Sequence, residues 1–110
     1  MIDRIRRRDA FARLRREGVR VRIDSLWCSF VPDSDVVPPQ VAFAIGRASG
    51  SAVRRNRLRR RVREILRTGD LPAGLWLIGT SGPADEHTFA ELDARVRAMV
   101  QSAASRATRR

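Results

Sequence analysis

Residues 52–68, AVRRNRLRRRVREILRT, combine the apolar spacing of an amphipathic helix with an unusual density of arginine. At 100° per residue, one narrow stripe of such a helix is aliphatic and can pack on a sheet. This stripe consists of Leu58, Val62, Ile65 and Leu66. The opposite side carries a polar row made of Asn56, Arg60, Arg63 and Arg67. The segment therefore requires a fold that buries its aliphatic side and leaves a row of guanidinium groups exposed.

Further arginines of this segment extend the basic surface. Arg57 and Arg59 flank the row. Arg54 and Arg55 stand at the helix N-terminus, where free backbone N–H groups and the helix dipole also favour phosphate. Glu64 is the only acid of the segment, so like charges repel one another along it. This pattern indicates a surface that binds an external anion; a solvated helix face and a helix lying on a membrane are the alternatives.

The whole chain shares this basic character. Its 110 residues carry a formal net charge of +11, and all 23 basic residues are arginines. Arginine forms two parallel hydrogen bonds to phosphate and stacks on bases, so nucleic acid is the expected partner. No apolar run approaches the roughly 20 residues that cross a bilayer, and a lone Cys28 can form no internal disulfide. We expect a cytoplasmic protein that binds no membrane and has no obligate protein partner.

The remaining patterns predict an α/β fold, a two-layer sandwich in a single domain over residues 1–110. The expected elements are a helix over 9–17, strands over 19–31, 41–46 and 75–80, and a last helix after Thr88. The apolar alternation of the first strand shifts near 24–25, as a bulge would shift it. Residues 1–7 and 101–110 are predicted to be flexible basic tails.

Helix termini carry their own signals. Asp9 is expected to cap the first helix, and Gly18 is expected to end it. Thr88 and Glu91 have the spacing of a capping box at the start of the last helix.

The sequence offers no constellation for cleaving RNA on its own. Such chemistry needs converging carboxylates for metal ions, or a positioned acid and base. Asp33 and Asp35 lie in a proline-rich loop typical of a solvated turn, and His87 precedes a helix cap. Cys28 lies in a strand without a basic partner in the local sequence. We therefore expect no catalytic residue and no metal-binding motif in this chain.

A motif of fixed spacing runs through the arginine-rich segment. It comprises Gly50, Ala52, Val53, Arg55, Asn56, Arg57, Arg59, Arg60, Arg63 and Glu64. In this order and spacing the residues resemble the signature of the protein subunit of bacterial ribonuclease P. The similarity extends over roughly residues 4–100, and includes Phe11 with Gly18 seven residues later and the Leu-Pro-Ala-Gly turn before the strand at 75–80.

The resemblance implies a fold with about four strands, three helices and a left-handed crossover between two parallel strands. It also implies a ribonucleoprotein endonuclease, in which the RNA subunit removes the 5′ leader of precursor tRNA with Mg²⁺ that is held mainly by the RNA. The residues expected to face the catalytic RNA are Arg47, Arg54, Arg55, Asn56, Arg57, Arg59, Arg60, Arg63 and Arg67. The residues expected to line a cleft for the single-stranded leader are Arg8, Phe11, Arg15 and Trp27.

The chain departs from the family pattern in its expected cleft. Arg15 stands at a position that is often aromatic, and Ser29 stands where the cleft strand often has tyrosine. Trp27 lies two residues from Ser29 on the same strand face. We hypothesise that Phe11 and Trp27 supply the rings on which leader bases stack; two ordinary core rings are the alternative.

Two other functions remain open on the residues alone. A structural rRNA-binding protein would share the arginine helix and the basic termini, but would not need the Arg-Asn-Arg spacing, and should sediment with ribosomes. A DNA-binding module lacks support, because no helix-turn-helix spacing or zinc knuckle is present.

Overall fold

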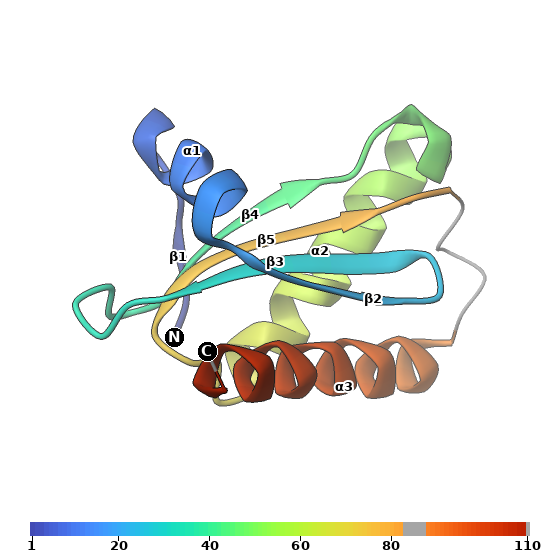
Figure 1. The fold of residues 1–110 in the computed structure, drawn as a ribbon. Helices are drawn as coiled ribbons and strands as arrows, with labels where there is room; N and C mark the ends of the chain where they lie inside the picture. The colour runs from blue at the N-terminus through green and yellow to red at the C-terminus, as the bar shows by residue number, and fades with distance from the viewer. Residues whose placement is uncertain (83–87, 110) are drawn as a thin grey trace.

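The computed structural model describes residues 1–82 and 88–109, which form a five-stranded sheet and three α-helices (Figure 1). In chain order the elements are β1 (Asp3–Arg4), α1 (Arg8–Glu17), β2 (Val19–Ile23), β3 (Leu26–Pro32), β4 (Gln40–Ala44), the 3-10 turn η1 (Arg47–Ser49), α2 (Ala52–Thr68), β5 (Gly74–Thr80) and α3 (Phe89–Thr108). The predicted α/β class with three helices is confirmed, and the sheet has one strand more than expected.

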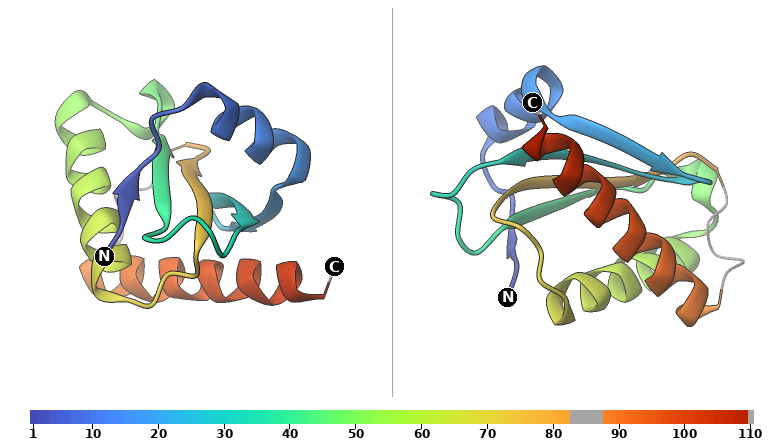
Figure 2. Two further views of the ribbon diagram at one scale, coloured as in Figure 1. Left: turned by 90° about the vertical axis from the view of Figure 1, so that its left-hand side faces the viewer. Right: turned by 60° about the horizontal axis from the view of Figure 1, so that its bottom comes forward.

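The helices lie on both faces of the sheet. α2 and α3 lie on one face, and α1 lies over part of the other (Figures 1 and 2). The larger core lies under α2 and α3, where the rings of Phe30 and Trp76 stack with centroids 3.9 Å apart. A smaller core joins Leu14 of α1 to Val31 and Leu75 of the sheet. Each face of the sheet buries its own set of apolar side chains. A slip of one residue in a central strand would turn every side chain of that strand to the opposite face and disrupt both cores, so the register is fixed.

The connection between β4 and β5 sets the position of α2. The sheet order is β1-β4-β5-β3-β2, and β4 and β5 are parallel neighbours joined through α2. In the left view of Figure 2 the chain runs away from the viewer in β4, returns through α2 on the side of α3, and runs away again in β5 to the right of β4. This is a left-handed crossover, as the family resemblance implies and contrary to the usual right-handed rule.

β2 and β3 form a hairpin with a two-residue turn at Asp24 and Ser25. Ile23 pairs with Leu26, and Asp24 has a φ of 55°. The predicted bulge at 24–25 is therefore wrong. A two-residue turn shifts the apolar alternation by one position, as a bulge does, because paired residues of a hairpin face the same side of the sheet.

The predicted C-terminal tail belongs largely to α3, and the predicted N-terminal tail contains β1. β1 pairs in parallel with β4, and Ile5 directly after it is buried. α3 runs to Thr108, and Ala103 in its last third is fully buried. The prediction of flexible tails over 1–7 and 101–110 is therefore wrong for β1 and for residues 101–108 of α3. Ile2, Ile5 and the alanines of α3 add apolar contacts to the two cores and hold both segments on the sheet.

The helix termini follow the sequence signals at α3 and only in part at α1. Thr88 Oγ1 accepts a hydrogen bond from the Glu91 N–H at 3.1 Å, which confirms the capping box. α1 begins at Arg8, one residue earlier than predicted, so Arg7 is its N-cap and no side chain caps it. Asp9 lies within the first turn, 3.2 Å from Arg7 Nε, and the expected Asp9 cap is wrong. Gly18 is the residue at which α1 ends, as predicted.

Candidate nucleic-acid interface

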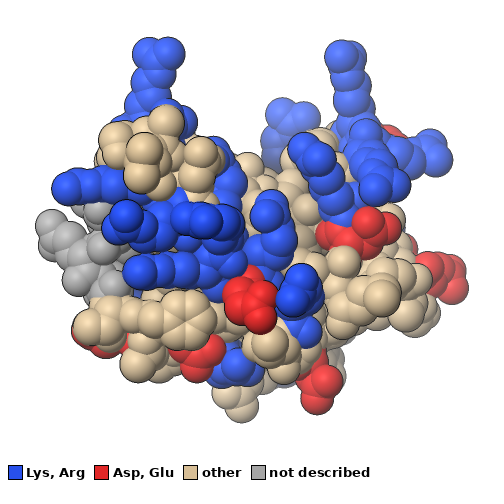
Figure 3. Space-filling model, turned by 180° about the vertical axis from the view of Figure 1, so that it is seen from behind, with Lys and Arg blue, Asp and Glu red and all other residues tan. Residues whose placement is uncertain are grey.

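α2 presents the predicted arginine row to solvent. Ser51 caps the helix by accepting a hydrogen bond from the Arg54 N–H, and the aliphatic stripe is buried against the sheet and α3. Asn56, Arg60, Arg63 and Arg67 are all exposed. Figure 3, seen from the side of α2, shows arginine side chains spread across this face with few acidic groups among them. We call Asn56, Arg59, Arg60, Arg63 and Arg67 the arginine face.

Acidic side chains neutralise this face only in part. Glu64 pairs with Arg67, whose Nη2 lies 3.3 Å from its carboxylate. Arg60 and Arg63 pair with no carboxylate among residues 1–82 and 88–109. The guanidinium groups therefore repel one another, and a bound external anion would reduce this repulsion.

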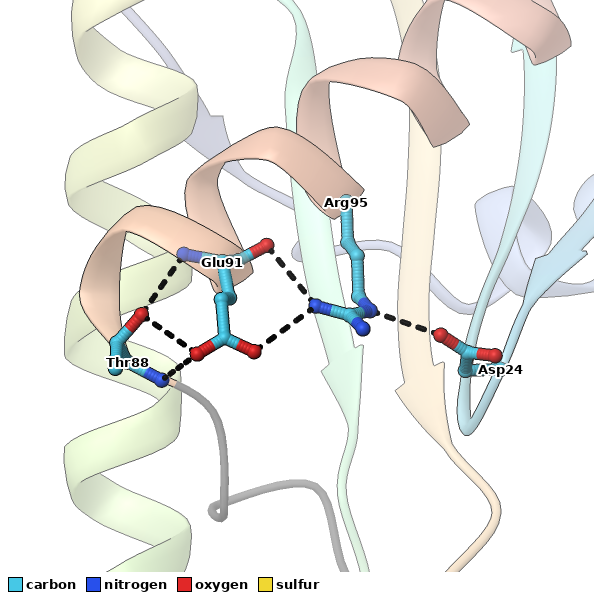
Figure 4. Close-up of polar contacts among 4 residues, drawn as sticks. All are labelled: Asp24, Thr88, Glu91 and Arg95. Carbon is cyan, nitrogen blue, oxygen red and sulfur yellow. Dashed lines mark hydrogen bonds and ion pairs between the residues drawn. The ribbon is translucent and has the colours of Figure 1, made fainter.

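Most charges in the N-terminal half of α3 are paired within the protein. Arg95 Nε lies 2.8 Å from Asp24 at the β2–β3 turn, and Arg95 also contacts Glu91 of the capping box (Figure 4). Arg97 Nε lies 3.0 Å from Asp93. These pairs leave Arg106 as the one arginine of α3 without a carboxylate partner in the described part of the chain, so the contrast with α2 favours the α2 side as the one suited to a polyanion.

Two arginines of the motif are held by the fold itself. Arg59 donates hydrogen bonds to the Ile45 carbonyl at 3.2 Å and to Asn56 Oδ1 at 2.8 Å. Arg55 is half-buried, and its Nε is enclosed without a hydrogen-bond partner among the described residues. Arg59 therefore joins α2 to the chain that follows β4, in addition to its place on the arginine face.

A hollow of about 700 Å³, the larger hollow, lies between α1, β1, β4 and α2. Its lining residues are Ile2, Asp3, Arg4, Ile5, Phe11, Val41, Ala42, Phe43, Arg59, Arg63 and Arg67. The Arg63 guanidinium lies over the Phe43 ring, 5.4 Å from its centroid, in a cation–π contact. The larger hollow thus joins Phe11, a residue of the predicted leader cleft, to the arginine face.

A second hollow of about 280 Å³, the smaller hollow, lies between the C-terminal half of α1 and the open face of the sheet. It is lined by Leu14, Arg15, Gly18, Arg20, Trp27, Ser29 and Leu77. Ser29 is buried and donates a hydrogen bond to the Leu14 carbonyl at 3.3 Å, so it ties α1 to the sheet.

The predicted leader cleft is divided between the two hollows. Arg15 and Trp27 meet in the smaller hollow, as predicted, whereas Phe11 lies in the larger one and is 38% exposed. Arg8 is exposed in the first turn of α1 and lines neither hollow. The two rings proposed for stacking therefore do not share one site.

Trp27 is half-buried and held between two neighbours. It lies against Gly79, its pairing partner in β5, so closely that a Cβ at Gly79 would be 2.3 Å from Trp27 Cζ2. The Arg20 guanidinium lies over the Trp27 ring, 4.4 Å from its centroid. Arg20 was not predicted as a site residue. The hairpin register pairs Arg20 with Ser29 and Arg22 with Trp27, which makes Arg20 and Trp27 diagonal neighbours on one face.

The other residues predicted to bind RNA lie around the N-terminus of α2. Arg54 and Arg57 are exposed on its first turns, and Arg47 is exposed in η1. Ser49 of η1 is buried and hydrogen-bonded to Thr80 of β5, which fixes the turn that carries Arg47. His87 lies outside the described residues.

The remaining polar candidates have structural surroundings. Arg13 Nη1 lies 2.7 Å from Asp33, and this hydrogen bond holds the pKa of Asp33 below its ordinary value. The Asp35 N–H also donates to Asp33, so Asp33 fastens the loop after β3 to α1. Burial raises the pKa of the Cys28 thiol to about 12. Over residues 1–82 and 88–109, no three side chains of His, Cys, Asp or Glu gather as metal ligands would. None of the helices in this part of the chain could span a bilayer.

Comparison with known proteins identifies a consistent set of relatives. The family model described as Ribonuclease P matches residues 2–104. The ribonuclease P protein component of Beutenbergia cavernae is 36% identical over 108 residues, which cover 96% of this chain and 91% of the relative. That of Thermobifida fusca is 34% identical over 113 residues, covering 90% and 77%.

Solved structures show the same fold. The RNase P protein of Staphylococcus aureus superposes with a TM-score of 0.79 at 19% identity, over 91% of this chain and 94% of that one. The RNase P protein of Thermotoga maritima gives a TM-score of 0.78 at 21% identity, over 91% and 96%.

Proposed function

The chain belongs to the family of bacterial ribonuclease P proteins, and on this basis we propose that it binds the RNA subunit of ribonuclease P and the 5′ leader of precursor tRNA. As a subunit of the holoenzyme it takes part in endonucleolytic removal of the leader. The chemistry resides in the RNA subunit, and the protein supplies binding and orientation.

The observation that carries the proposal is the arginine face. Its guanidinium groups are exposed apart from that of half-buried Arg59, its two central arginines have no carboxylate partner in the described part of the chain, and its aliphatic back is buried. A rigid helix fixed in this way presents several phosphate ligands at constant spacing, and little backbone conformational entropy is lost when RNA binds. The arginines around the N-terminus of α2 extend this surface, so we assign the RNA subunit to this side.

The two hollows beside α1 support leader binding. Each joins an aromatic ring to arginines, with Phe11 near Arg63 and Arg67 in the larger hollow and Trp27 near Arg15 in the smaller one. Single-stranded nucleic acid is bound by this combination of stacking rings and a basic groove. We propose that the leader passes along α1 through both hollows.

Magnesium belongs to the RNA subunit in this proposal. Mg²⁺ is usually held by carboxylates together with phosphates and water, and the described residues offer no cluster of acidic side chains. The described side chains therefore do not fit a magnesium site of their own. The buried free thiol of Cys28 agrees with a protein that functions in the cytoplasm, where thiols stay reduced.

Reconstitution tests the proposal. The purified protein is added to the matching ribonuclease P RNA and precursor tRNA at low Mg²⁺, and 5′ maturation is measured. We expect stimulation by the natural protein and a marked loss in the double variant Arg60→Ala/Arg63→Ala.

The matched control is Arg97→Ala/Arg109→Ala, which removes the same net charge from α3 and its C-cap and should leave stimulation intact. Absence of stimulation by the natural protein would overturn the proposal, and sedimentation of the protein with ribosomes would then favour a structural rRNA-binding role.

A further inference from the structure

We propose that a leader nucleobase stacks on the Arg20 guanidinium, and that Trp27 is a positioning residue which holds this guanidinium in place. The inference rests on the proposed leader binding and names the group that contacts the base in the smaller hollow. It revises the hypothesis that the Trp27 ring is itself the stacking surface.

The ring of Trp27 is already occupied. On the side of the sheet it lies against Gly79, where even a Cβ would come within 2.3 Å of it. The Arg20 guanidinium covers the ring at 4.4 Å from the centroid. A base that stacked directly on Trp27 would have to displace Arg20 and lose this cation–π contact.

Arg20 itself is free to receive a base. It is exposed, it lines the smaller hollow with Arg15, and it pairs with no carboxylate in the part of the chain that the structure describes. A guanidinium is planar and has two faces, so the face turned away from Trp27 can stack on a base while its charge attracts the leader backbone. Contact with the indole and the neighbouring strand reduces the entropy lost on binding.

The test compares holoenzymes assembled with variant proteins for their affinity toward precursor tRNA and toward mature tRNA without a leader. Arg20→Ala should weaken binding of the precursor by about 5- to 150-fold, the contribution of one stacked base, and leave binding of mature tRNA unchanged. Arg20→Lys keeps the charge without the planar surface and should not restore the affinity. Arg22→Ala is the matched control, because it removes the same charge from the same face of β2.

A series of precursor tRNAs, each lacking the base at one leader position, locates the contact. At the position that stacks, removal of the base should abolish the effect of Arg20→Ala, since the two changes delete the same interaction. Trp27→Leu should weaken binding of the precursor as Arg20→Ala does. The double variant should bind the precursor no more weakly than either single variant. Circular dichroism and thermal melting confirm that each variant is folded.

Three outcomes would overturn the inference while the proposed function stands. Precursor affinity that is unchanged or tighter in Arg20→Ala but weaker in Trp27→Leu would place the base on Trp27. Full affinity of Arg20→Lys for precursor tRNA would show that charge alone makes the contact. An equal loss of precursor affinity in Arg22→Ala would show the same. A different result would overturn both proposals: equal binding of precursor and mature tRNA by the natural holoenzyme would contradict leader binding itself.

Discussion

The guanidinium of Arg59 donates a hydrogen bond to the backbone carbonyl of Ile45, 3.2 Å away. A residue of the RNA-binding motif thus also fastens α2 to the chain that leaves β4. Arg60, the next residue, is exposed. A loss of stability is therefore expected only when Arg59 is replaced, whereas a loss of RNA binding is expected at both neighbours.

Replacement of Arg59 by alanine should lower the free energy of unfolding by about 1 kcal/mol, as the loss of one such hydrogen bond does. Arg60→Ala should change it by less than about 0.5 kcal/mol. Urea denaturation measures the difference, and both variants should bind the RNA subunit more weakly. Equal stability of the two variants would show that the Arg59 contact contributes nothing to the fold.

Affinity for RNA should depend steeply on salt. If about five arginines contact phosphates, log affinity should fall with log salt at a slope near −3.5. Arg60→Ala/Arg63→Ala should reduce the slope to about −2.1, because two phosphate contacts are lost. The helix content of the double variant should be unchanged, since both side chains point away from the core. A nearly flat salt response of the natural protein would contradict the assignment of the arginine face.

Gly79→Ala should displace the Trp27 ring. The new Cβ would lie 2.3 Å from Trp27 Cζ2, and overpacking of this kind destabilises proteins by about 1–3 kcal/mol. Chemical denaturation and tryptophan fluorescence together detect the change. Gly46→Ala is the control, because a Cβ at Gly46 has no neighbour within 4 Å. An identical spectrum and stability in the Gly79 variant would mean that the ring moves aside without cost.

Acid should weaken the tie between α1 and the loop after β3. The hydrogen bond from Arg13 lowers the pKa of Asp33 in the folded state, so the unfolded state takes up a proton at higher pH than the folded state. The stabilisation is complete above the ordinary pKa of aspartate, 3.8, and is lost as the pH falls through the lowered value.

Asp33→Asn should therefore lower the melting temperature near about pH 6 and have little effect near about pH 2. Asp35→Asn, in the same loop, serves as the control. A deficit of the same size at both pH values would exclude titration of Asp33 as the cause.

Cys28 should be inert in the folded protein. With its pKa raised to about 12 by burial, about one molecule in ten thousand carries the thiolate near pH 8. Thiol-specific reagents should label it only slowly in buffer and rapidly in denaturant. Fast labelling without denaturant would reveal local opening of β3.

The parts of the fold that sequence analysis predicted are those with local, strongly periodic signals. α2 has the bounds and the buried stripe that its helical spacing indicates, and the capping box marks the start of α3. β1 was missed because two residues that pair with a distant strand show no periodicity. The left-handed crossover follows from no local pattern and was expected from the family resemblance alone.

Prediction of the site was limited by the hairpin. Interpreting 24–25 as a bulge kept Arg20 and Trp27 on one continuous strand, where they are seven residues apart. The two-residue turn at Asp24 brings them together on one face. The division of the leader cleft between two hollows likewise depends on β1, which lines the larger hollow beside Phe11.

Because Ile2 and Asp3 line the larger hollow, anything fused to Met1 emerges beside the arginine face. A purification tag at that end, above all an acidic one, would compete with RNA for the guanidinium groups and understate affinity. The far end of α3 lies on the opposite side of the molecule from α2 (Figure 2). The end of α3 in turn lies against β2, where Arg106 donates a hydrogen bond to the Arg20 carbonyl at 3.1 Å. A tag after α3 therefore suits measurements of RNA-subunit binding, and measurements of leader binding are best made with tags removed altogether.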